Sequence, residues 1–234
     1  MGADRLSWPG LDHRPLGHAR APAERSAQAA AQLFGVTLFN DWSARDIQAW
    51  EYQPLGPFLA KNFATSISPW VVTPEALAAF RMPQPSRPDG DPAPLAYLFD
   101  ERDQREGALD LELEVLLQTP CLKAQHLPPH RLSIGSARHM YWTPAQLVAH
   151  HSSNGCNLRS GDLFGSGTLS APTPDGLGSL IEITEGGKRP VALASGSTRT
   201  FLEDGDEIIF RARARREGYA SIGLGEVRGA VLPA

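Results

Sequence analysis

Six side chains able to bind a polar substrate or a metal ion occur within one short segment. In chain order they are Asp41, Arg45, Gln48, Tyr52, Lys61 and Thr65. Arg45, Gln48 and Tyr52 are spaced by three and four residues, so on a helix they share one face. A carboxylate, two cations and hydroxyl groups suit an anionic, oxygen-rich substrate beside a hard metal ion. The alternative interpretation is the ordinary polar face of a surface helix.

Two short elements are predicted to position these side chains. The run LFGVTLFND at 33–41 predicts a buried strand that delivers Asp41 at its end. The following SARDIQAWEYQ at 43–53 predicts a helix with Ser43 as N-cap, and Pro54 stops it.

The rest of the chain predicts short elements separated by turns. They are an Ala-rich helix at 27–35, a strand at 68–74 leading into a helix through Phe80, a hairpin at 95–118 with its second arm at 108–118, and a helix at 143–155 capped by Thr143. Short β-rich pieces follow this last helix. The predicted fold class is therefore α+β and β-dominated.

Composition limits the possible partners and compartments. The 234 residues suit one domain, or a domain with a tail, and the net charge of −4 gives no attraction for nucleic acid or an anionic membrane. No apolar run approaches the roughly 20 residues that span a bilayer. Two cysteines form no disulfide framework, so we expect a reduced, cytoplasmic chain.

Longer stretches resemble the fumarylacetoacetase family. The most specific is NDWSARDIQAWEYQPLGPFLAKNF at 40–63, and the resemblance continues in MYWTPAQLVAHHSSNGCNLRSGDLFGSGTLS at 140–170, in FLEDGDEIIF and in GLGEVRGAVLPA. It covers 33–234 and leaves 1–32 as an unmatched, poorly ordered leader. It implies a mixed β-sandwich roll, a homodimer, and metal-dependent hydrolysis of a β-diketo acid, 4-fumarylacetoacetate, to fumarate and acetoacetate in tyrosine and phenylalanine breakdown.

The resemblance also implies metal ligands. The ion is Ca²⁺ or Mg²⁺, and Asp41 matches a ligand carboxylate. Lys61 and Thr65 match positions that contact a second cation. An ammonium group cannot ligate a metal, so Lys61 would use its carbonyl oxygen and turn its side chain towards developing negative charge.

Catalytic and substrate-binding roles follow from the same resemblance. Arg45 and Gln48 match groups that stabilise a carbanion, together with Lys61. Gln48 also contacts substrate, as do Tyr52 and Thr168. Glu182 matches the carboxylate that orients the general-base histidine.

Some of the family's groups have no counterpart in the segment before Asn40. In the family a general-base histidine, a further ligand aspartate and an E-x-E pair lie upstream, whereas the acidic residues of 1–39 are Asp4, Asp12 and Glu24. We therefore expect a chain truncated at its N-terminus, with little or no hydrolysis of its own. Glu112 and Glu114 share one strand face and are the alternative E-x-E pair, but we favour a solvated strand face.

The histidines and one cysteine are predicted to take no part in the chemistry. His13 and His18 fall in the leader, His150 and His151 are structural, His126, His130 and His139 are surface or loop residues, and Cys156 is a small buried residue without an adjacent base. Two further hypotheses stay open. One is a superfamily cousin acting on acylpyruvates or oxaloacetate, against which the stretch WEYQPLGPFLAKNF argues; the other is a catalytically dead fragment or dimerisation partner.

Overall fold

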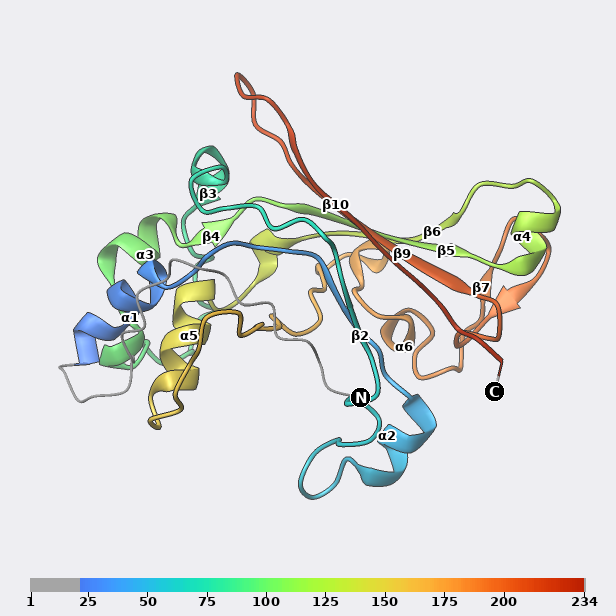
Figure 1. Cartoon of the computed structure of the whole chain (residues 1–234), viewed down its shortest axis with the longest axis horizontal. Helices are drawn as coiled ribbons and strands as arrows, with labels where there is room; N and C mark the ends of the chain where they lie inside the picture. Colours follow the sequence, from blue (N-terminus) through green and yellow to red (C-terminus); the bar gives the residue numbers. More distant parts are fainter. Residues whose placement is uncertain (1–21, 234) are drawn as a thin grey trace. The chain divides into compact units, whose positions relative to one another are not determined.

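The computed structural model describes residues 22–233 and contains helices and strands in about equal measure (Figure 1). The α+β prediction is confirmed, but strands do not dominate. The chain forms two compact units. The first comprises the described residues up to Phe34, with Phe80–Asp110 and Arg138–Gly167; the second comprises Gly35–Ala79, Leu111–Ala137 and the chain from Thr168. Every predicted site residue lies in the second unit.

The second unit is built on an antiparallel four-stranded sheet with the strand order β10-β9-β5-β6. Its elements are β1 (Phe39–Asp41), α2 (Arg45–Glu51), β2 (Thr65–Ile67), β5 (Glu112–Gln118), α4 (Pro120–Ala124), β6 (His130–Ser136), the 3₁₀-helix η4 (Pro174–Gly176), α6 (Leu180–Ile183), β7 (Val191–Ala192), β8 (Thr198–Arg199), β9 (Glu207–Ala214) and β10 (Ile222–Ala230). Leu117 of β5 pairs with Ile208 of β9, and both are buried with Leu193 in one apolar cluster.

The predicted hairpin at 95–118 is wrong in its first arm. Residues of that arm form a 3₁₀-helix, η2 (Ala96–Leu98), and a helix, α3 (Glu101–Glu106). The carboxylate of Asp100 caps α3 by accepting a hydrogen bond from the backbone N–H of Asp103 at 2.8 Å. The second arm is confirmed as β4 (Ala108–Leu109) and β5, but β5 pairs with β6 and β9 instead.

The first unit packs around α5 (Pro144–Ser152), next to α1 (Pro22–Ala31) and η2. Its buried cluster contains Ala29, Leu98, Val148 and Ala149. The predicted cap of α5 is confirmed: Thr143 Oγ1 accepts from the Gln146 N–H at 3.1 Å, and the Gln146 side chain accepts from the Thr143 N–H at 3.0 Å. The two-residue strand β3 (Arg81–Met82) pairs with β4.

Several predicted boundaries shift. The Ala-rich helix is α1, which starts at Pro22 inside the predicted leader; residues 1–21 of that leader lie outside the described residues. The strand predicted at 33–41 is regular only in β1, and the one at 68–74 is reduced to a bridge between Val36 and Val72.

Two other short elements span positions in the sequence where one unit ends and the other begins. The helix predicted before Phe80 is the three-residue η1 (Ala78–Phe80), and η3 (Ala137–His139) occupies a second border. No helix among residues 22–233 combines the length and the apolar character needed to cross a membrane.

Candidate functional site

Asp41 and Lys61 form an ion pair at the end of β1. Lys61 Nζ lies 2.6 Å from Asp41 Oδ2, with the two side chains 29% and 43% exposed. In the β1–β2 register Asp41 stands opposite Thr65, so the predicted metal-contacting trio is brought together. Partial exposure limits what this ion pair adds to folding to about 1 kcal/mol or less.

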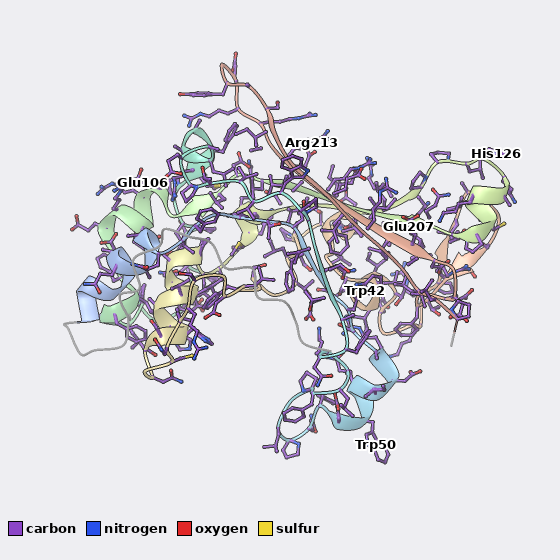
Figure 2. The ribbon with its side chains drawn as sticks, viewed as in Figure 1. Trp42, Trp50, Glu106, His126, Glu207 and Arg213 are labelled. Carbon is purple, nitrogen blue, oxygen red and sulfur yellow. The ribbon has the colours of Figure 1, made fainter. Side chains whose placement is uncertain are left out.

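Trp42 anchors this end of β1 to the large sheet. Its Nε1–H donates to Ser66 Oγ on β2 at 2.9 Å, and its side chain packs against the apolar cluster that contains Leu117. Figure 2 labels Trp42. The ring also lies where a side chain at Gly229 of β10 would stand, 2.5 Å from an ideal Cβ. Only glycine allows this approach. The position of Asp41 is thus fixed by its partly buried neighbour.

Helix α2 brings Arg45 and Gln48 into contact. Arg45 Nη1 donates to Gln48 Oε1 at 2.7 Å, which confirms the shared face predicted from their spacing. The predicted N-cap is wrong: Ala44 holds that position, and the Ser43 hydroxyl donates to the Asp41 carbonyl at 3.2 Å. Tyr52 follows the last helical residue and is 49% exposed.

Glu51 is a structural anchor that the sequence interpretation missed. Its carboxylate accepts hydrogen bonds from the backbone N–H groups of Phe58 at 2.7 Å, Leu59 at 3.1 Å and Ala60 at 2.8 Å. The bond from the Ala60 N–H contributes most to lowering the pKa of Glu51 below the ordinary glutamate value. Lys61 is the next residue, so Glu51 holds the loop that presents it. The residues involved are seven to nine positions apart, beyond any helical spacing rule.

Glu182 and Thr168 lie on another segment of the second unit. Glu182, on α6, accepts from Ser170 Oγ at 3.0 Å and from Ser179 Oγ at 2.5 Å. Thr168 is exposed, and its methyl group lies 2.8 Å from an ideal Cβ at Gly178. Within the described part of the chain, no hydrogen bond or ion pair joins either residue to Asp41, Arg45 or Lys61.

Comparison with known proteins decides the family. The family described as "Fumarylacetoacetate (FAA) hydrolase C-terminal" matches residues 16–232. The chain belongs to this fumarylacetoacetate hydrolase family. The family prediction is thereby confirmed.

Relatives named fumarylacetoacetase resemble nearly all of this chain. The protein of Dictyostelium discoideum is 46% identical over 208 residues, covering 88% of this chain and 46% of the relative. The Homo sapiens protein is 45% identical over 208 residues (89% and 47%), and that of Caenorhabditis elegans 46% over 215 residues (92% and 48%). The chain spans about half the length of the curated relatives it matches.

The residues of this chain fit a divalent ion only in part. Oxygen donors of the right chemistry are present in the Asp41 carboxylate, the Thr65 hydroxyl and the Lys61 carbonyl. Among residues 22–233, however, no group of three or more His, Cys, Asp or Glu side chains could hold a metal ion. The described residues therefore supply a fraction of a ligand set.

Glu112 and Glu114 are engaged elsewhere. Glu112 bonds to Arg213, and Glu114 Oε2 lies 3.8 Å from Arg211 Nη1, across β5 and β9 (Figure 2 labels Arg213). A hollow of about 330 Å³ lies on this sheet face between the charged side chains. The glutamates lie on one strand face, as favoured, but that face is only partly solvated because both side chains are part-buried and paired with arginines.

The described histidines have structural surroundings. His150 Nδ1 lies 2.8 Å from Tyr97 Oη. The His151 ring packs edge-on against the Phe164 ring, with 5.0 Å between the two ring centroids. His126 and His139 are exposed as predicted. His130 is in β6 instead of a loop, and burial lowers its pKa. His13 and His18 lie outside the described residues.

Cys156 corrects a prediction. It is part-buried, and its Sγ lies 3.3 Å from His151 Nε2, so a basic group is adjacent after all. The chain reverses at Gly155, which has a φ of +88° that glycine adopts readily. This turn brings the cysteine back to a histidine five positions earlier.

Proposed function

We propose that this chain supplies part of the active site of a fumarylacetoacetase. The reaction is hydrolysis of the carbon–carbon bond of 4-fumarylacetoacetate to fumarate and acetoacetate, the last step of tyrosine and phenylalanine breakdown. The observation that carries the proposal is a backbone hydrogen bond between the segments that bear two polar pairs, Arg45–Gln48 and Asp41–Lys61. The Ala44 N–H donates to the Ala60 carbonyl at 3.0 Å, which ties the helix bearing Arg45 and Gln48 to the loop bearing Lys61.

Two cations there suit a carbanion leaving group. When the bond breaks, its electron pair stays on the acetoacetate fragment until a proton arrives. The Arg45 guanidinium and Lys61 ammonium stabilise that charge, and Gln48 orients Arg45 through the 2.7 Å hydrogen bond. Gln48, Tyr52 and Thr168 offer donors and acceptors to the oxygens of the β-diketo acid substrate.

Glu182 supports the other half of the reaction, the activation of water. Its carboxylate is held by two serine hydroxyls, so it has a fixed direction. A carboxylate fixed in this way orients an imidazole and stabilises its protonated form. In this proposal the general-base histidine comes from outside the described residues.

The proposed ion is Ca²⁺ or Mg²⁺, with Asp41 as one ligand and Lys61 and Thr65 near a second cation. A bound divalent ion polarises carbonyl oxygens of the substrate. We propose further that the four-stranded sheet is part of the family's mixed β-sandwich roll, and that the protein works as a cytoplasmic homodimer.

An inert fragment is the second candidate, because the described residues hold no group of three metal-ligating side chains. We therefore expect the 234-residue chain alone to hydrolyse little or no 4-fumarylacetoacetate. A rate near that of the full-length relatives would contradict this part of the proposal.

The decisive test is a chimera that joins the unmatched half of the human relative to this chain. The loss of ultraviolet absorbance of 4-fumarylacetoacetate is followed with and without added Mg²⁺ or Ca²⁺. We expect ion-dependent turnover, reduced about 10²- to 10³-fold by Arg45→Ala because a stabilising cation is lost. Asp46→Asn, which removes an exposed charge from the same helix, is the matched control and leaves the rate nearly unchanged.

A folded chimera without turnover would refute the proposed function. Faster hydrolysis of an acylpyruvate, or decarboxylation of oxaloacetate, would favour the superfamily cousin.

A further inference from the structure

The C-terminal end of α5 carries a nucleophile and a base that the proposed function does not use (Figure 1 labels α5). Cys156 Sγ lies 3.3 Å from His151 Nε2, and we call these two residues the thiol–imidazole pair. Both belong to the first unit, whereas the candidate site lies in the second. The thiol is part-buried and the imidazole is exposed, so a reagent in solvent can reach the pair.

Hydrogen bonds fix the backbone that carries the thiol. The Gly155 N–H donates to the Ser152 carbonyl at 3.0 Å, and the Cys156 N–H donates to Asn154 Oδ1 at 3.0 Å. Leu158, two residues beyond the cysteine, packs against the buried cluster of the first unit. The turn is therefore tied down before and after Cys156.

Core packing orients the imidazole. The His151 and Phe164 rings meet edge-on, with an angle of 85° between their planes. Phe164 in turn packs against the same buried cluster as Leu158. Because this contact restrains the ring while Nε2 faces Cys156 Sγ, the base is positioned before any reagent arrives.

Space for a reagent is open beside the thiol. Gly155 adopts a φ of +88°. A Cβ added at this glycine would meet no heavy atom of the described residues within 4 Å, its chain neighbours apart. The side of the turn next to Cys156 is therefore unobstructed.

Cys121 provides an internal comparison. It is also part-buried, and its Sγ accepts a hydrogen bond from Gln125 Nε2 at 3.3 Å. A carboxamide cannot take up the proton of a thiol, whereas a neutral imidazole can. The two cysteines thus have similar exposure and differ in whether a base is adjacent.

We infer that the thiol–imidazole pair is a modification site for alkenes conjugated to a carbonyl group. The thiolate is the nucleophilic form of cysteine, and an adjacent base generates it. His151 Nε2 takes the Cys156 proton as sulfur bonds to the alkene carbon β to the carbonyl. The π pair of the alkene moves to the α carbon as an enolate, to which the imidazolium returns the proton. The product is a thioether, and no oxidant or reductant is consumed.

The substrate of the proposed function is itself such an alkene. In 4-fumarylacetoacetate a C=C bond lies between a carboxylate and a ketone, and both groups withdraw electrons from it. The pair therefore captures intact substrate as a thioether, in a reaction separate from carbon–carbon bond hydrolysis. This capture step rests on the proposed function, whereas the modification site itself does not.

Site-resolved alkylation tests the pair. The 234-residue chain is treated with N-ethylmaleimide at neutral pH, quenched at intervals, digested and analysed by mass spectrometry. We expect Cys156 to react about tenfold faster than Cys121, and His151→Asn to remove most of that advantage because the base is lost. His150→Asn is the matched control, since it changes the neighbouring histidine of α5, whose Nδ1 faces Tyr97 Oη, and leaves both rates unchanged.

The ratio of the two rates keeps the test valid if a variant is less stable. Unfolding exposes both cysteines, so it cannot slow Cys156 alone. Equal rates at Cys156 and Cys121 in the wild type overturn the inference. An unchanged Cys156 rate in His151→Asn, or an equal loss in His150→Asn, also overturns it.

A second arm of the experiment replaces N-ethylmaleimide with 4-fumarylacetoacetate and looks for the mass of one intact substrate on Cys156. An adduct there that His151→Asn weakens supports the capture step. Modification by the maleimide without this adduct rejects the capture step. Turnover by the chimera is measured separately: an active chimera without the adduct upholds the proposed function and rejects capture, and the adduct beside an inactive chimera does the reverse.

Discussion

Glu51 shows how a single carboxylate can position a functional loop. It is on the last turn of α2, and the three N–H groups that it binds belong to the residues just before Lys61. Hydrogen bonds to the charged form favour ionisation, so the pKa of Glu51 is lowered. The loop is thereby stabilised by an ionised carboxylate, and protonation should loosen it.

We expect Glu51→Gln to loosen this loop without unfolding the unit. An amide oxygen accepts more weakly than a carboxylate, so the Phe58 and Ala60 amides should exchange with solvent roughly tenfold faster. Because the pKa is lowered, the wild-type loop should stay protected above the ordinary glutamate value of 4.5 and lose protection as the pH falls below it.

Hydrogen exchange at neutral and acidic pH measures both effects of this substitution. The control is Asp46→Asn on the same helix. Unchanged exchange at Phe58 and Ala60 in Glu51→Gln would contradict the anchoring role.

At the residue scale the sequence predicts contacts set by helical spacing and misses those made by irregular backbone. Arg45 and Gln48 were expected to meet because positions three apart on a helix do so. The Cys156–His151 contact depends on the chain reversal at Gly155. The hydrogen bonds that Glu51 accepts come from backbone N–H groups of an irregular loop. Such contacts have no fixed period along the chain.

At the scale of elements, a buried ion pair joins β8 to the turn before β9. Arg199 donates from Nε to Asp206 Oδ2 at 2.7 Å and from Nη2 to Oδ1 at 3.1 Å, and Asp206 is fully buried. The Glu203 N–H also donates to Asp206. This pair ties the turn that precedes β9 to β8.

Arg199→Ala should lower the free energy of unfolding by about 3–5 kcal/mol, because Asp206 is left as an uncompensated buried charge. Arg189→Ala removes an arginine from the exposed pair with Glu185 and should cost less than about 1 kcal/mol. Urea unfolding of the two variants beside the wild type measures the difference. Equal losses would show that the Arg199–Asp206 pair does not stabilise the fold.

Element prediction succeeds where a cap or a period-two pattern is strong, as at Thr143 and along β5. It fails at 95–107 because the apolar residues there suggested a strand, while Asp100 and the acidic first turn specify α3. The partners of β5 were also missed, since β9 is about ninety residues further along the chain. Strand pairing over that separation depends on tertiary packing, which local pattern does not encode.

At the scale of the whole molecule, the two units differ in how they respond to acid. In the second unit, hydrogen bonds from Lys123 and Arg228 respectively contribute most to lowering the pKa values of Glu207 and Glu226. In the first unit, burial raises the pKa of Asp103, which accepts a hydrogen bond from Thr143 Oγ1 at 2.6 Å. The carboxylates therefore favour folding of the two units in opposite pH ranges.

For each unit, the direction in which stability changes with pH follows from the difference between the folded and unfolded pKa values. The lowered glutamates contribute stability that is complete above their ordinary value of 4.5 and is lost as the pH falls through their folded pKa values. The pKa of Asp103 is raised, so its effect on the stability of the first unit has the opposite pH dependence. Its charged form destabilises the first unit at neutral pH, and that cost disappears as the pH falls through a pKa raised above 3.8. Acidification should thus weaken β9 more than α5.

The different acid responses of β9 and α5 can be measured by hydrogen exchange between neutral pH and about pH 4, with protection corrected for the intrinsic pH dependence of exchange. We expect protection to fall in β9 (Glu207–Ala214) and to be better retained in α5 (Pro144–Ser152). Asp103→Asn cannot titrate, so it should raise the protection of α5 at neutral pH and flatten its pH dependence, with β9 unchanged. If α5 and β9 instead lose protection in parallel, in the wild type and in Asp103→Asn alike, burial of Asp103 does not set the acid response of the first unit. The two units would then respond to acid as one.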